Sequence, residues 1–144
     1  MAKDIMDTVN ARMKDGWIRA WVAIEVLAVT EEAAEGSLKK HVAEMEKEQD
    51  SIIYKKDFKK SEKAENPFRK GSPAFSKVVE IELIARRFED LVYLILNYAP
   101  SSVEILEPAT IKVEMGEAQG ILNSLAELVH NFVSATKGAV TLRT

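Results

Sequence analysis

Hydrophobic and polar residues alternate with two different periods along this 144-residue chain. Between Asp4 and Lys14 the apolar residues recur at the three-and-four spacing of an amphipathic helix, and Gly16 follows where a helix C-cap is expected. From Trp21 to Val29 the period changes to two and β-branched residues dominate. The pattern therefore predicts a short leading helix and then a first strand.

Thr30 marks the start of a second helix. Its hydroxyl suits an N-cap, and the carboxylates of Glu31 and Glu32 suit the positive end of a helix dipole. Apolar residues then recur at helical spacing as far as Met45. We expect this helix to end near Lys47.

Two strands and a long turn follow this helix. Residues 51–58 and 75–85 have the alternation of strands, and the stretch between them contains Asn66-Pro67 and Gly71-Ser72-Pro73. A long antiparallel hairpin is the simplest arrangement. Further on, the pattern predicts a helix ended by Pro100 and a short strand over 102–108.

The last predicted element is an amphipathic helix over 117–135, with Gly138 expected to stop it. Eight apolar residues repeat at three-and-four spacing along it: Ala118, Ile121, Leu122, Leu125, Leu128, Val129, Phe132 and Val133.

This order of elements predicts an α+β fold in one domain over residues 1–144. It contains the βαββαβ order of a ferredoxin-like sandwich, with an extra N-terminal helix and a long C-terminal helix. The alternative is a mostly helical bundle, because residues 78–98 could form one long buried helix. The strict alternation from Val79 to Leu83 favours a strand instead.

In such a sandwich, helices cover one sheet face and the other is open. We expect the covered face to carry Val22, Ile24, Val26, Val79, Ile81 and Leu83. The open face would carry Trp21, Glu25, Leu27, Val78, Glu80, Glu82, Ile84, Glu104 and Leu106. Trp21, Glu25, Glu80 and Glu82 form a candidate sheet-face site, either for a hard cation or for acid–base chemistry. The structural alternative is a network of ion pairs with the lysines of the second strand.

The charge distribution is asymmetric. The chain has a net charge of −3, but residues 55–71 carry seven positive and three negative side chains, so this segment is +4 and the remainder −7. The positive residues are Lys55, Lys56, Lys59, Lys60, Lys63, Arg69 and Lys70. They are candidate nucleic-acid contacts, with Phe58 and Phe68 as candidate stacking rings. The structural alternative is a solvated hairpin whose lysines balance neighbouring glutamates.

Several chemistries lack their residues in this chain. There is no cysteine, and the two histidines, His41 and His130, have no partner at a metal or catalytic spacing. No phosphate-loop motif is present, and no apolar stretch is long enough for a bilayer. We therefore expect no catalytic residue, no metal and no cofactor, no membrane association, and a cytoplasmic location.

Three functions remain open. The first is a non-catalytic binding or regulatory module that acts as a homo-oligomer, because the last helix must bury its apolar stripe, with a small ligand or a protein as a further partner. The second is nucleic-acid binding through the basic hairpin, and the third is an enzyme with an acidic sheet-face site.

Overall fold

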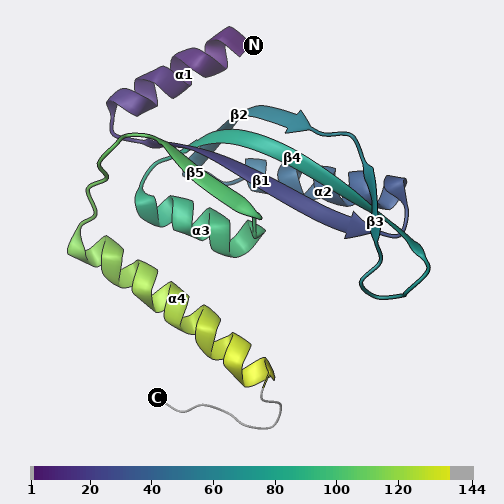
Figure 1. Ribbon diagram of the computed structural model, residues 1–144. Coiled ribbons are helices and arrows are strands. Elements are labelled where there is room, and N and C mark those ends of the chain that lie inside the picture. Colours follow the sequence, from purple (N-terminus) through teal and green to yellow (C-terminus); the bar gives the residue numbers. More distant parts are fainter. Residues whose placement is uncertain (1, 137–144) are drawn as a thin grey trace. The chain divides into compact units, whose positions relative to one another are not determined.

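The computed structural model describes residues 2–136 and has a mixed α+β fold with an antiparallel five-stranded sheet (Figure 1). The chain divides into two compact units, residues 1–111 and 112–144, and each is described by itself. That the chain is one domain stays a prediction. The expected stop at Gly138 lies outside the described residues.

The sheet has the strand order β2-β4-β1-β5, and β3 (Glu62–Glu65) pairs with the first residues of β4. The long central strands are β1 (Ile18–Ala28) and β4 (Pro73–Ala85), flanked by β2 (Ser51–Phe58) and by β5 (Ser102–Glu107) at the other edge. All pairings are antiparallel. Since β4 is a strand along its whole length, the helical-bundle alternative is wrong.

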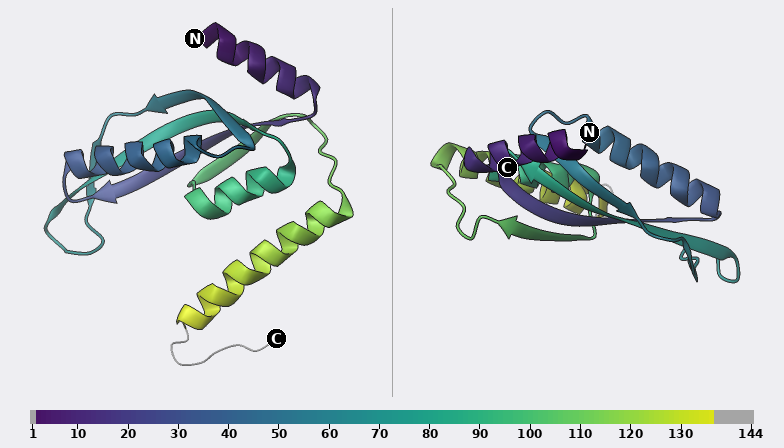
Figure 2. Two further views of the ribbon diagram at one scale, coloured as in Figure 1. Left: turned by 180° about the vertical axis from the view of Figure 1, so that it is seen from behind. Right: turned by 90° about the horizontal axis from the view of Figure 1, so that it is seen from above.

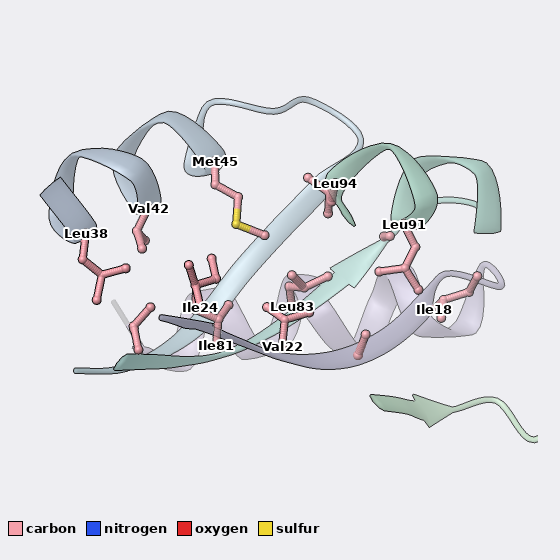
Figure 3. Close-up of a cluster of buried hydrophobic side chains, with 13 residues drawn as sticks. Ile18, Val22, Ile24, Leu38, Val42, Met45, Ile81, Leu83, Leu91 and Leu94 are labelled. Carbon is pink, nitrogen blue, oxygen red and sulfur yellow. The ribbon is translucent and has the colours of Figure 1, made fainter. Parts of the chain in front are cut away.

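Two helices cover one face of the sheet. They are α2 (Glu31–Glu46) and α3 (Phe88–Tyr98), and Figure 3 shows their Leu and Met side chains pointing at the strands. The core consists of Ile18, Ala20, Val22, Ile24, Leu38, Val42, Met45, Val79, Ile81, Leu83, Ala85, Leu91 and Leu94. Val26 packs against it, so all six residues expected on the covered face lie there.

The start of α2 and the end of α3 agree with the signals in their sequences. The Thr30 hydroxyl accepts a hydrogen bond from the Ala33 amide at 3.0 Å and so caps α2. At the end of α3, Ala99 adopts the left-handed conformation (φ 48°), and its amide donates to the Ile95 carbonyl. Pro100 then prevents further helix.

The leading helix α1 (Ala2–Lys14) lies at the β2 side of the sheet. It contacts β2, and its Val9 is fully buried. Ile84 lies on this face, opposite Arg19 and Ile52, and is also fully buried. The expectation that Ile84 lies on an open face is therefore wrong, because its side chain is fully buried.

The hairpin of β2 and β4 forms as expected and continues beyond β2. The short strand β3 (Glu62–Glu65) pairs with residues 73–76 of β4, and its end of the hairpin projects from the sheet (Figure 2). Asn66 makes the turn, since its side-chain oxygen accepts from the amides of Phe68 (2.8 Å) and Arg69 (3.0 Å).

The second unit contains the helix α4 (Met115–Thr136). None of its residues is buried, although it carries the apolar stripe expected from the sequence. Within residues 2–136, no helix combines the length and apolar character needed to cross a membrane.

Candidate functional site

Three of the four expected sheet-face residues lie together. Trp21, Glu80 and Glu82 line a small cavity of about 50 Å³ on the face opposite α2 and α3. The Trp21 indole N–H donates to Glu80 Oε1 at 3.2 Å, and this contact is diagonal because Glu82 is the residue directly opposite Trp21. The cavity has room for little more than water.

A β-bulge in β2 brings Tyr54 to this group. The register against β4 shifts between Ile53 and Lys55, and the hydroxyl of Tyr54 donates to Glu82 Oε1 at 2.9 Å. Burial, and then this hydrogen bond, raise the pKa of the Tyr54 hydroxyl to about 12. Tyr54 is therefore a neutral donor over the physiological pH range.

The fourth expected residue, Glu25, is separate from the other three. It accepts a hydrogen bond from the Ser76 hydroxyl and lies opposite Val78. Among the described residues, no group of three or more His, Asp or Glu side chains could hold a metal ion. The acidic residues of this face are thus divided between two places.

Lysines neutralise the paired carboxylates. Lys55 Nζ lies 3.4 Å from Glu82 Oε2, and Lys59 Nζ lies 3.3 Å from Glu80 Oε2. Hydrogen bonds to Asp57 (2.6 Å) and Glu80 raise the pKa of Lys59. These contacts are the ion pairs with lysines that the structural alternative predicts.

The basic hairpin thus divides into a paired and an unpaired part. Besides Lys55 and Lys59, Lys56 pairs with Glu46 of α2 at 3.1 Å. In the described part of the chain, the other four cations make no ion pair: Lys60, Lys63, Arg69 and Lys70.

The two candidate stacking rings also separate. Phe58 packs against the core, so it cannot stack on a base without disrupting the fold. Phe68 lies at the hairpin turn and is 90% exposed. A nucleic-acid contact, if made here, rests on Phe68 and the four unpaired cations.

Sequence reasoning missed a pocket of about 590 Å³ at the end of the sheet near α1. Its walls come from α1, the residues just before β1, the residues around the start of β2, and the two residues that follow β4. It is lined by Arg12, Asp15, Trp17, Gln49, Asp50, Ile52, Arg86 and Arg87. These residues come from three separate stretches of the sequence and form no recognisable binding motif. The pair Arg86-Arg87 after a predicted strand was the feature of the sequence that could have indicated the pocket.

Exposed apolar residues gather on two elements. On the edge strand β5, Val103, Ile105 and Leu106 are each 40–45% exposed. On α4 and just before it, seven large apolar side chains are exposed: Val113, Met115, Leu122, Leu125, Leu128, Val129 and Phe132. Solitary exposed apolar residues are ordinary, but a continuous set on one helix indicates an interaction surface.

His41 has a structural role. Its Nε2 lies 2.7 Å from the Tyr98 carbonyl oxygen, and its ring meets the Tyr98 ring edge-on at 5.4 Å. These contacts join α2 to the end of α3. The Tyr98 hydroxyl also donates to Glu48 at 2.6 Å, which, with burial, raises its pKa to about 12.

The family model of the MJ0538 family matches residues 19–143, which is most of the chain. The chain belongs to the MJ0538 family. The matched region includes the sheet apart from Ile18, both covering helices and α4, whereas α1 precedes it. No curated protein and no solved structure matches the chain.

Proposed function

We propose that this MJ0538-family protein is a non-catalytic binding or regulatory module that acts as a homo-oligomer assembled through α4. The observation that carries the proposal is the exposed apolar stripe of α4. Met115 is 86%, Leu122 61% and Phe132 67% exposed, values that are costly for a helix in water without a partner.

The spacing of the stripe supports helix-to-helix association. Apolar or small residues occupy both seam positions of three consecutive heptads: Met115, Ala118, Leu122, Leu125, Val129 and Phe132. Ile121 and Leu128 widen this stripe on one side. A sustained heptad repeat is typical of helices that pack against one another.

The charges of α4 favour a second copy as the partner. Between Met115 and Thr136 the acidic residues are Glu117 and Glu127, and both lie outside the seam positions. Two copies of the stripe can therefore meet without burying a charge, which would be expensive. A helix of 22 residues is about 33 Å long, enough for three heptads of contact.

Unfolding at different protein concentrations tests this proposal. The thermal midpoint of an oligomer that is stabilised by association rises with protein concentration, whereas the midpoint of a monomer does not change. If the thermal midpoint stays constant between roughly 1 and 100 μM protein, assembly is refuted.

We also propose that the sheet is of the ferredoxin-like type. The strand order β2-β4-β1-β5, with α2 following β1 and α3 following β4, supports this assignment. The elements α1 and β3 are then additions to the ferredoxin-like βαββαβ unit.

Nucleic-acid binding by the hairpin turn is the second candidate. It is favoured by the 90% exposure of Phe68 beside Arg69 and Lys70, which have no ion pair within the described residues. Binding of single-stranded RNA at low salt, weakened by Phe68→Ala and by added salt, would support it. Equal binding by the Phe68→Ala variant and the intact protein would exclude this mode.

An acidic enzyme site is not the function we propose. Glu80 and Glu82 are each engaged by a lysine and an aromatic donor, and Glu25 lies apart from them.

A further inference from the structure

The pocket of about 590 Å³ beside α1 gathers positive charge from separate parts of the first unit. Arg12 comes from α1, whereas Arg86 and Arg87 follow the end of β4. The pairing of β1, β2 and β4 brings these segments to one end of the sheet. All eight lining residues belong to residues 1–111, so the pocket is complete within that unit.

The three guanidinium groups have different partners. Arg86 Nη1 lies 3.6 Å from Asp50 Oδ1, and Arg87 Nε lies 3.3 Å from Asp90 Oδ2 outside the pocket lining. Arg12 is placed over the Trp17 ring at 5.6 Å, and no carboxylate of the described residues pairs with it. Its N–H groups are therefore available to a ligand.

The other lining residues suit a small molecule. Trp17 and Ile52 supply apolar surface, and the Gln49 amide supplies both a donor and an acceptor. The volume lies within the range of about 300–1,000 Å³ found for small-molecule sites. The pocket thus combines hydrogen-bonding charge with an apolar wall.

We propose that this pocket binds a small phosphate-bearing anion, with Arg12 and Arg86 as the principal contacts. A guanidinium presents its N–H groups in a planar fork that matches two phosphate oxygens. Several arginines facing one cavity suit a dianion better than a singly charged carboxylate, which one arginine satisfies. The proposal names a ligand class for the binding module proposed above and rests on that role.

Asp50 sets the expected strength of binding. It already holds Arg86, so an incoming phosphate must compete with its carboxylate for the same guanidinium. Asp15 adds a second negative charge to the lining. We therefore expect modest affinity in the intact protein and stronger binding when Asp50 is neutralised.

Calorimetric titration of the full chain at constant ionic strength tests the proposal. The probes are inorganic phosphate and glycerol 3-phosphate, with glycerol and acetate as controls. We expect saturable binding of a phosphate probe below about 10 mM and much weaker binding of acetate. Equal affinity for both phosphates assigns the site to the phosphate group alone, whereas preference for glycerol 3-phosphate assigns it to a phosphate ester.

Matched variants locate the site. Arg12→Gln and Arg86→Gln should each weaken binding about tenfold, and Asp50→Asn should strengthen it. Arg69→Gln makes the same charge change at the hairpin turn, outside the pocket, and should leave the affinity unchanged. In a Trp21→Phe chain, Trp17 is the remaining tryptophan, and its fluorescence should follow the same titration.

Absence of saturable binding by about 10 mM would overturn the proposal, as would equal weakening by Arg69→Gln and Arg12→Gln. Should Arg86→Gln fail to fold, the opposite effects of Arg12→Gln and Asp50→Asn still decide it. The pocket is complete within residues 1–111, so phosphate binding and assembly through α4 can be tested separately. If the intact protein binds no phosphate but has the solution mass of an oligomer, this inference is refuted and assembly through α4 still stands.

Discussion

The indole N–H of Trp21 donates to the carboxylate of Glu80 at 3.2 Å, across the diagonal of the β1–β4 pair. Lys59 Nζ lies 3.3 Å from Oε2, the other oxygen of the same carboxylate. The Trp21 side chain is partly buried. The Glu80 carboxylate thus joins Trp21 of β1 to Lys59, which follows β2.

Trp21→Phe should lower the free energy of unfolding, because the ring loses its donor and part of its buried surface. The hydrogen-bond contribution should be about 0.5–1 kcal/mol, at the low end because Glu80 is partly exposed to solvent. Chemical denaturation of Trp21→Phe, made both in the intact protein and in a Glu80→Ala background, isolates the contribution of this hydrogen bond. If the substitution costs as much in a Glu80→Ala background as in the intact protein, the two residues are not coupled.

Tyr54 should make stability depend on pH in the alkaline range. Its folded-state pKa of about 12 lies above the ordinary value of 10.0, so folding favours the protonated hydroxyl. The contribution of Tyr54 is then fully present below about pH 10 and is lost as the pH rises towards about 12.

The Tyr54→Phe variant tests this dependence. Its free energy of unfolding should be lower than that of the intact protein at pH 8, and the difference should shrink between about pH 10 and 12. Tyr93→Phe is the matched control, because the Tyr93 side chain is 48% exposed. If the difference in free energy of unfolding between the intact protein and Tyr54→Phe stays constant across this pH range, the Tyr54–Glu82 hydrogen bond does not have this role.

Ala99→Gly should stabilise the protein by about 0.5–1 kcal/mol. Ala99 adopts the left-handed conformation at the end of α3, with φ 48° and ψ 55°, where glycine avoids the strain of a β-carbon. Ala43→Gly provides the matched control, since Ala43 is exposed within α2 and the same substitution there should destabilise by a similar amount. If Ala99→Gly and Ala43→Gly shift the urea midpoint in the same direction, the strain assigned to Ala99 is contradicted.

Much of the fold could be predicted from periodicity. The bounds of β2 agree with the expected 51–58, because its pattern is delimited by polar residues on both sides. The first strand begins at Ile18 rather than Trp21, since Ile18 and Ala20 continue the inward-facing alternation into the core. Local pattern is a good guide wherever one face of an element is buried.

The features that depend on distant contacts could not be predicted. The bulge at Tyr54, the burial of Ile84, and the presence of Arg12 and Arg86 in one pocket all depend on which segments pair or pack together. Likewise, counting lysines indicated a basic hairpin, but Lys55 and Lys59 are held by glutamates of β4. Charge along a sequence does not distinguish a paired cation from a free one.

We propose that the apolar stripe of α4 joins copies of this chain. Leu125 lies at the centre of the stripe, and the neighbouring Ser124 lies on the polar side of the same helix. A carboxylate introduced at position 125 would have to be buried in the assembly, whereas one at position 124 would remain in solvent.

The most direct test is the mass of the full chain in solution, measured by light scattering during size-exclusion chromatography. We predict a multiple of the 16.1 kDa chain mass for the intact protein and for Ser124→Glu, and a shift towards 16.1 kDa for Leu125→Glu. A uniform 16.1 kDa species for the intact protein at micromolar concentration, or an assembly unaffected by Leu125→Glu, would contradict the claim.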